Sequence, residues 1–227
     1  MKTIIIVEST DTGVDKELID NILKKRGLNY SDFCIKSTAN PESKKFGSIN
    51  DVLKYIEYEI YSDTKIEWIK EVQNVLIIVD ADEDAEGQFN KIVEALEANQ
   101  KKENFNIPSN LGVINKTDPN KINIGVFLMP DCKNIGSLET LCLKALNSNE
   151  KQKIKDCIDK YFDCLEAKGH LKLKDKEKMT ENNLSKSKFR VCMATPDPDH
   201  YTKSIIESID FESSEFDQLT NFIKQTE

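Results

Sequence analysis

Two short apolar stretches decide the fold: residues 4–7 (IIIV) and residues 74–79 (NVLIIV). Each is followed directly by an acidic residue, Glu8 after the first and Asp80 after the second. Continuous runs of aliphatic, largely β-branched residues are typical of strands that are buried on both faces of a parallel sheet. The sequence therefore predicts that both stretches are inner strands of such a sheet.

Working outward, strand and helix patterns alternate over the first 130 residues. Apolar residues at helical spacing predict helices around residues 18–26, 49–61 and 85–96, and apolar runs predict two more strands over 33–36 and 123–129. Residues 99–121 are polar and predict a long irregular connection. This alternation is typical of a parallel sheet covered by helices, so we expect an α/β, Rossmann-like core over residues 1–130.

Past residue 130 the pattern becomes mainly helical. The spacing of apolar residues predicts helices over 138–146, 152–165 and 214–224, a loop rich in Lys and Asn over 168–187, and one strand over 189–194. We therefore expect residues 131–227 to form a mainly helical C-terminal extension packed on the core.

Composition excludes several classes of protein. With 38% hydrophobic and 32% charged residues, the chain is neither collagen-like nor broadly disordered. No apolar run approaches the roughly 20 residues that a membrane span needs, and no secretory signal is visible. The six cysteines form no C-x-x-C pair, so no disulfide framework is expected, and Cys142 and Cys157 are interpreted as small buried apolar residues. We expect a soluble, cytoplasmic protein.

The charge distribution bears on partners. A net charge of −8 counts against a nucleic-acid coat protein. Residues 168–190 nevertheless carry eight basic residues against three acidic ones, which is a candidate surface for phosphate contact. Oligomeric state is not readable from these patterns.

The acidic residues at the strand ends are the strongest chemical signal. Because neighbouring parallel strands end at the same edge of a sheet, Glu8, Asp80 and Asp82 should converge there, with the last two pointing the same way in extended chain. Clustered carboxylates repel one another unless a cation lies among them, and oxygen-only ligands suit Mg²⁺ or Mn²⁺. Helix capping is the alternative for single acids and is preferred for Asp84, but one helix start cannot account for all three.

With these residues in view, the chain resembles the Toprim domain of topoisomerases, bacterial primases and OLD-type nucleases. It is most similar to a group of small stand-alone Toprim-like proteins. The resemblance rests on Glu8 with Asp11 three residues later, and on Asp80 with Asp82. Further matching segments are ADEDAEG over 81–87, MPD over 129–131, Gly136, Leu138 with Glu139, and KSKFR over 186–190.

The resemblance implies residue roles and a reaction. Glu8 would be the general acid/base or a metal ligand, and Asp80 and Asp82 would hold Mg²⁺ or Mn²⁺. Asp131 and Glu139 follow the fourth predicted strand and are candidates for a second metal position, the alternative being an N-cap acid and a helix-surface Glu. Lys188 is a candidate to neutralise charge on a phosphate in the transition state, the alternative being an exposed lysine before an edge strand. The expected activity is metal-dependent hydrolysis of phosphodiester bonds in nucleic acid, in phage defence or RNA processing and beside an ATPase partner.

Other functions stay open at this point. A catalytically inactive Toprim scaffold that binds a protein or a nucleotide is favoured by the acidic charge and by Ser9, where Toprim proteins commonly carry Gly. A receiver-like phosphorylation site on Asp80 is a further alternative. A P-loop is excluded because the chain has no Gly-Lys pair, and no G-x-G-x-x-G follows the first strand.

Overall fold

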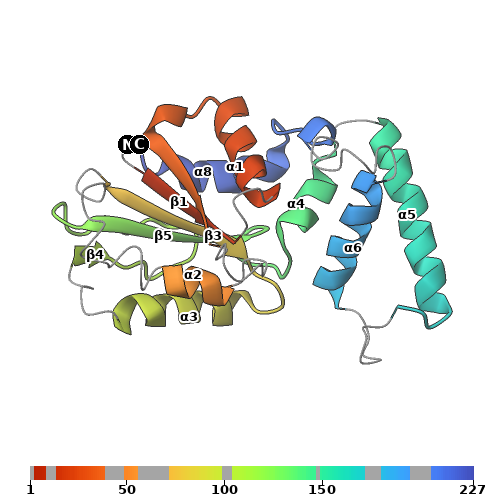
Figure 1. Ribbon diagram of the computed structural model, residues 1–227, viewed down its shortest axis with the longest axis horizontal. Coiled ribbons are helices and arrows are strands. Elements are labelled where there is room, and N and C mark those ends of the chain that lie inside the picture. Colours follow the sequence, from red (N-terminus) through yellow and green to blue (C-terminus); the bar gives the residue numbers. More distant parts are fainter. Residues whose placement is uncertain are drawn as a thin grey trace.

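The computed structural model describes residues 3–8, 14–38, 49–55, 72–98, 104–146, 149–171, 180–194 and 206–227 (Figure 1). Its elements are, in chain order, β1 (Thr3–Val7), α1 (Val14–Lys25), η1 (Tyr30–Asp32), β2 (Phe33–Ser37), α2 (Ile49–Tyr55), β3 (Asn74–Asp80), α3 (Ala85–Ala98), β4 (Phe105–Asn106), β5 (Ile122–Met129), α4 (Leu138–Lys144), α5 (Asn149–Ala167), α6 (Glu181–Ala194), η7 (Ser214–Phe216) and α8 (Asp217–Lys224).

The strands form one five-stranded parallel sheet in the order β2-β1-β3-β5-β4, which confirms the predicted α/β class. Strands β1 and β3 lie side by side at its centre, with Val7 opposite Ile78. The chain moves outward from β1 to β2, and from β3 it moves in the opposite direction to β4 at the far edge before it returns to β5. The crossover direction therefore reverses between β1 and β3, and in such sheets this is where ligands bind, beyond the carboxyl ends of the strands.

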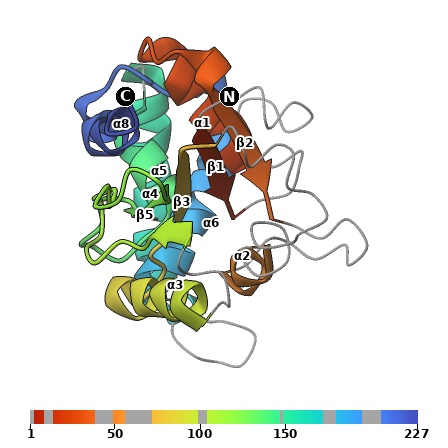
Figure 2. The same ribbon diagram turned by 90° about the vertical axis from the view of Figure 1, so that its left-hand side faces the viewer.

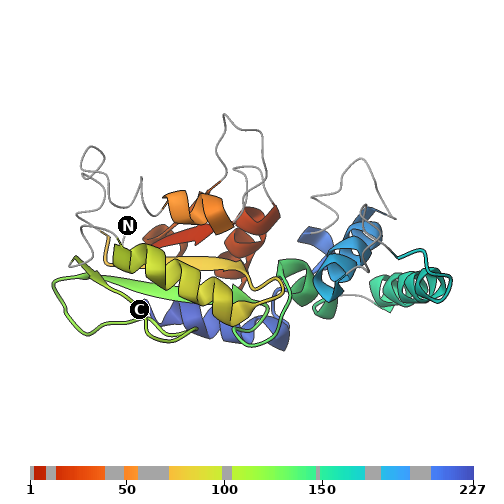
Figure 3. The same cartoon turned by 90° about the horizontal axis from the view of Figure 1, so that it is seen from below.

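Alternate residues of each inner strand face two separate cores. Ile5 and Val7 of β1 join the cluster that contains the buried residues of α1 and α8, whereas Ile4 and Ile6 join the cluster under α2 and α3. Figures 2 and 3 show the resulting layers, with α1 and α8 on one face of the sheet and α2 and α3 on the other. Burial on both faces explains why the sequences of these strands are continuous apolar runs.

The last residues of the chain return to the sheet. Phe222 of α8 packs on Phe127 of β5 with ring centroids 5.4 Å apart. Gly125 permits this approach, because a Cβ there would lie 2.9 Å from the Phe222 ring and 2.8 Å from Ile114. By contrast, α4, α5 and α6 lie beyond the ends of β1, β3 and β5 (Figure 1). Within the described ranges, no helix has both the length and the apolar character that crossing a membrane requires.

The structure corrects three predictions in the C-terminal part. Residues 181–187, predicted as the end of a loop, are the first turns of α6. Residues 189–194 are not a strand but the last turns of α6. Phe189, Cys192 and Met193 are buried while Val191 is exposed, so the buried residues follow one face of a helix. The short run of aromatic and β-branched residues had indicated a strand instead. Cys157 is exposed rather than buried. The predictions for the other cysteine features agree with the structure, because all six cysteines are free and Cys142 is buried. The described part of the 99–121 connection contains one short strand, β4.

Two other predicted features can be compared only in part. The helix predicted over 49–61 is described as far as Tyr55, and the rest of it lies outside the described residues, as do Ser9 and Asp11. The predicted capping role of Asp84 is confirmed, since its Oδ1 accepts a hydrogen bond from the Gly87 N–H at 2.8 Å in the first turn of α3.

Arg26 joins the end of α1 to the C-terminal segment. Its guanidinium donates to the Phe211 carbonyl at 2.6 Å and to the Ser213 carbonyl, and it pairs with Asp217 at 2.8 Å. Replacing Arg26 with Met should lower the free energy of unfolding by about 2–3 kcal/mol, because two part-buried carbonyls lose a charged donor. Urea denaturation would measure this. The exposed Lys25→Met variant should stay within about 0.5 kcal/mol of wild type, and an equal loss in both would contradict the assignment.

Candidate functional site

The carboxyl ends of β1 and β3 place two acids next to each other. Glu8 follows the last residue of β1, and Asp80 is the last residue of β3. Since the two strands are hydrogen-bonded neighbours, both side chains lie at the point where the crossover direction reverses. The predicted convergence of these strand ends is thus present in the structure.

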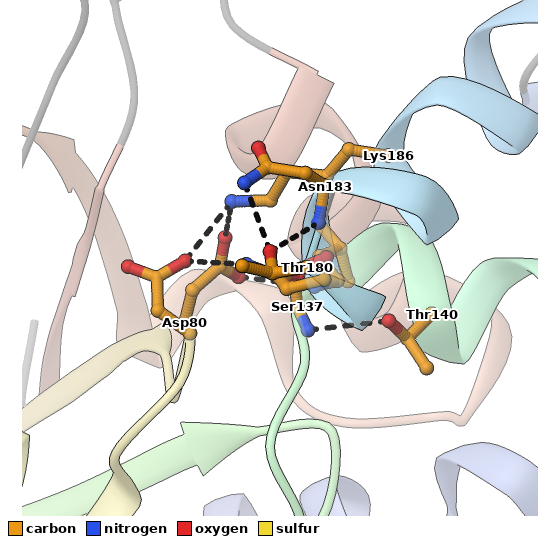
Figure 4. Close-up of polar contacts among 9 residues, drawn as sticks. Asp80, Ser137, Thr140, Thr180, Asn183 and Lys186 are labelled. Carbon is orange, nitrogen blue, oxygen red and sulfur yellow. Dashed lines mark hydrogen bonds and ion pairs between the residues drawn. The ribbon is translucent and has the colours of Figure 1, made fainter. Parts of the chain in front are cut away.

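Asp80 is held by the helices that lie beyond the sheet (Figure 4). Its Oδ1 accepts a hydrogen bond from the Leu138 N–H at 3.0 Å, at the beginning of α4. Its Oδ2 pairs with the ammonium of Lys186 on α6 at 2.9 Å. A carboxylate at the first N–H of a helix is favourably placed toward the helix dipole. Asp80 is therefore positioned from both helices and is only 17% exposed.

Asp82 reaches the same ammonium by a different route from the one expected. The chain is not extended at this residue, whose φ is 50°, and the Asp82 and Gly136 backbones exchange hydrogen bonds of 2.9 Å in each direction. The Asp82 carboxylate accepts from Asn182 Nδ2 at 2.7 Å and from Lys186 Nζ at 3.2 Å. Lys186 thus bridges Asp80 and Asp82.

Helix α6 supplies both partners of Asp82 from one face. Asn182 and Lys186 are four residues apart, which places them one above the other on a helix. Thr180 fixes the beginning of the helix: its hydroxyl accepts from the Asn183 N–H at 3.3 Å and from Asn183 Nδ2 at 2.9 Å (Figure 4). The same helix start therefore determines where the lysine points.

Buried acidic side chains are concentrated in this region. Burial, with the nearby charges of Asp80 and Asp82, raises the pKa of Glu8 to about 8. Burial, with the charges of Asp80 and Glu139, likewise raises the pKa of Asp15, in the first turn of α1, to about 8. These shifts mean that the carboxyl groups of Glu8 and Asp15 are mostly protonated at pH 7.

The pKa values of the paired residues Asp80 and Lys186 are shifted as well. Burial raises the pKa of Asp80 to about 6, against the opposing effects of Lys186 and the Leu138 N–H. Burial alone would lower the pKa of Lys186, but the carboxylates of Asp80, Asp82 and Glu139 hold it above its ordinary value. Lys186 is therefore a cation throughout the physiological pH range. We call Glu8, Asp15, Asp80, Asp82, Glu139, Asn182 and Lys186 the acidic cluster.

Two of the residues selected from the sequence are engaged elsewhere. Lys188 pairs with Asp159 of α5 at 2.7 Å and lies 5.9 Å from the centre of the Phe162 ring. Asp131 accepts hydrogen bonds from the Asn134 N–H at 2.8 Å and Nδ2 at 2.7 Å, within its own loop. These bonds outweigh the effect of partial burial and lower its pKa. The structure brings neither side chain into the acidic cluster.

Three members of the cluster were missed in the sequence. Lys186 lies in the KSKFR segment on which the Toprim resemblance partly rests, but residues 168–187 were predicted as a loop, so the helical spacing that distinguishes Lys186 from Lys188 was not used. Asn182 was missed for the same reason. Asp15 looks like an ordinary acid in the first turn of a helix, and nothing in its local sequence indicates that this turn faces the ends of β1 and β3.

The donor chemistry of the cluster suits Mg²⁺ or Mn²⁺, because all its acidic ligands are oxygens. As these side chains are arranged, however, they leave no free position for a metal ion. Among the described residues, no group of three or more His, Cys, Asp or Glu side chains is disposed to bind a metal ion. The position between Asp80 and Asp82 is taken by the Lys186 ammonium. A divalent cation fits these residues only if Lys186 moves.

The comparisons with known proteins give the family. No curated protein and no solved structure matches the chain significantly. Residues 2–227 match the family described as "Protein of unknown function (DUF3226)". Because that match spans nearly the whole chain, the protein belongs to the DUF3226 family.

Proposed function

We propose that this protein is a Toprim-type phosphodiesterase that hydrolyses nucleic acid with the help of Mg²⁺ or Mn²⁺. One observation carries the proposal: Glu8 and Asp80 follow adjacent parallel strands at the reversal of the crossover direction, and Asp82 shares a cation with Asp80. The parallel sheet with its flanking helices supports the Toprim assignment, as do the acids at two strand ends. A nuclease setting in phage defence or RNA processing, with an ATPase partner, comes from the resemblance alone.

In the proposed reaction, each residue has a distinct role. Glu8, with a pKa near neutrality, is suited to take a proton from the attacking water or to return one to the leaving oxygen. Asp80 and Asp82 would hold the cation, with Glu139 near enough to influence them. A bound divalent cation supplies polarisation of the phosphoryl oxygen and a more acidic water. Lys186, rather than Lys188, is placed to neutralise charge that develops on the phosphate.

A second candidate is a scaffold that binds a nucleotide or protein without turnover. The observation that favours it is the ion pair of Lys186 with Asp80 and Asp82, at 2.9 and 3.2 Å, in the place where a catalytic cation would have to bind. In this alternative, Lys186 is the permanent counter-ion of the two aspartates. The chain then keeps the layered fold but has no metal to activate water.

Cleavage assays separate the two candidates and identify the substrate. Single-stranded DNA, double-stranded DNA and RNA would each be incubated with the protein in Mn²⁺, in Mg²⁺ and in EDTA. The phosphodiesterase proposal expects metal-dependent cleavage that Glu8→Gln lowers about 100-fold or more, since general acid–base catalysis contributes about 10²–10⁴. Glu17→Gln, on the exposed side of α1, is the matched control and should cleave like wild type. If all three substrates stay intact under every condition, the binding scaffold becomes the better assignment.

A further inference from the structure

We propose that Lys186 is an internal competitor of the divalent cation, so that a cation enters the acidic cluster only by displacing the Lys186 ammonium from Asp80 and Asp82. This inference rests on the proposed function for the identity of the ligand. It goes further by stating what regulates occupancy of the site. A lysine on the C-terminal extension would thereby control whether the sheet edge can bind metal.

The geometry makes lysine and metal mutually exclusive. Lys186 Nζ is 2.9 Å from Asp80 Oδ2 and 3.2 Å from Asp82 Oδ1. A Mg²⁺ or Mn²⁺ ion bound to the same two oxygens would need them at about 2.1 Å and would leave no room for an ammonium at hydrogen-bond distance. Two positive charges so close together would also repel strongly in a partly buried site.

A second observation indicates that the cluster has ligand capacity that Lys186 does not use. Asn182 is only 5% exposed and donates through Nδ2 to Asp82 Oδ1 at 2.7 Å. The other atom of the same amide group, Oδ1, is buried and has no hydrogen-bond partner among the described residues. A buried carbonyl oxygen without a partner is costly, and it is also a ligand that hard cations accept. The amide that holds Asp82 through its nitrogen therefore also carries a neutral oxygen that is not used in any hydrogen bond.

The charge balance and the lysine stem make exchange feasible. Asp80 and Asp82 bring two carboxylates to one ammonium, so Lys186 neutralises only one of the two formal negative charges that it contacts. A divalent cation therefore neutralises more charge than the single ammonium does. Lys186 is 25% exposed and has a flexible four-carbon stem, so its ammonium can leave toward solvent without moving α6.

Titration of the whole protein with Mn²⁺ by calorimetry tests the inference. The variants are Lys186→Met, which keeps the stem and removes the charge, and Lys188→Met, which makes the same change two residues later where the lysine pairs with Asp159. We expect Lys186→Met to bind Mn²⁺ about tenfold or more tighter than wild type, because the competing charge is gone. Lys188→Met should bind like wild type.

The outcomes separate this inference from the proposed function. If wild type binds Mn²⁺ and Lys186→Met binds it equally or more weakly, Lys186 is not a competitor, whereas the metal-dependent function stands. If only Lys186→Met binds, the competition is supported and the natural chain is the non-catalytic scaffold. If neither binds, both ideas are overturned.

Folding of the variant provides a second readout. Should Lys186→Met fail to fold without metal, circular dichroism during addition of Mn²⁺ replaces calorimetry. Refolding at millimolar Mn²⁺, but not at the same ionic strength of NaCl, supports a cation site that the lysine normally fills. Equal effects of the two salts would show general charge screening and overturn the inference.

Discussion

Metal-dependent cleavage should fall about 100- to 1,000-fold when Asp80 is replaced with asparagine. Asp80 ends β3 beside Glu8 and is the aspartate that both α4 and α6 hold in place. Removing its charge removes a ligand for the cation, and loss of one preorganised electrostatic group costs a factor of this size. The initial rate of oligonucleotide cleavage in Mn²⁺ measures the effect. The Mn²⁺-induced thermal shift, about 5–10 °C for wild type at 100 times the dissociation constant, should vanish as well.

Two controls distinguish lost chemistry from lost folding. Asp84→Asn removes a charge from the same acidic segment, yet asparagine caps a helix as well as aspartate does, so this variant should cleave and fold normally. In EDTA at pH 8, Asp80→Asn should be at least as stable as wild type, because its environment disfavours the ionised carboxyl. A variant that cleaves like wild type would remove Asp80 from the mechanism.

Without metal, the protein should become less stable as the pH rises from 5 to 9. Unfolded Glu8, Asp15 and Asp80 lose their protons near pH 4, from model values of 4.5, 3.8 and 3.8, whereas in the folded protein their pKa values lie at about 8, 8 and 6. The folded state therefore binds more protons than the unfolded state between these limits. Stability is greatest below pH 4 as far as these groups are concerned, and it is lost as the pH rises through 6 to 8.

The expected loss between pH 5 and pH 9 is several kcal/mol, because each of these groups costs about 1.4 kcal/mol per pH unit until the pH reaches its folded pKa. Urea denaturation in EDTA across this range measures it. Glu8→Gln should reduce the dependence, because one of the two groups with a folded pKa of about 8 no longer ionises, while the exposed Glu17→Gln should keep it. Saturating Mn²⁺ should also flatten it, since a cation compensates the ionised carboxylates. Stability that rises toward pH 9 in EDTA would show that these carboxyl groups ionise without cost in the folded state.

The inner strands could be predicted from sequence because burial on both faces leaves a local record. Residues 4–7 and 74–79 are continuous apolar runs, and the structure confirms them as β1 and β3. Their adjacency was an assumption, because β2 lies between them in sequence, whereas the sheet order is β2-β1-β3. The sequence therefore predicted the strand ends that carry Glu8 and Asp80, and the sheet order placed these two acids next to each other.

The positions of the other members of the acidic cluster could not be predicted from the local sequence pattern. Asp82 reaches Asp80 through a residue with positive φ and a bridge to Gly136, not through an extended chain. Asp15 and Lys186 belong to helices that are remote from β3 in sequence. Their spacing along the chain contains no information about which helix end faces the sheet edge, because that depends on how α1 and α6 pack.

The sequence alone therefore determined the inner strands, the acids at their ends and the net negative charge of the chain, because burial and strand ends leave patterns in neighbouring residues. Tertiary structure decided which lysine meets those acids. Lys186 and Lys188 are two residues apart and chemically identical, yet α6 turns one toward Asp80 and Asp82 and the other toward Asp159. A helix rotates by about 200° over two residues, so the choice depends on the packing of α6 against α4 and α5.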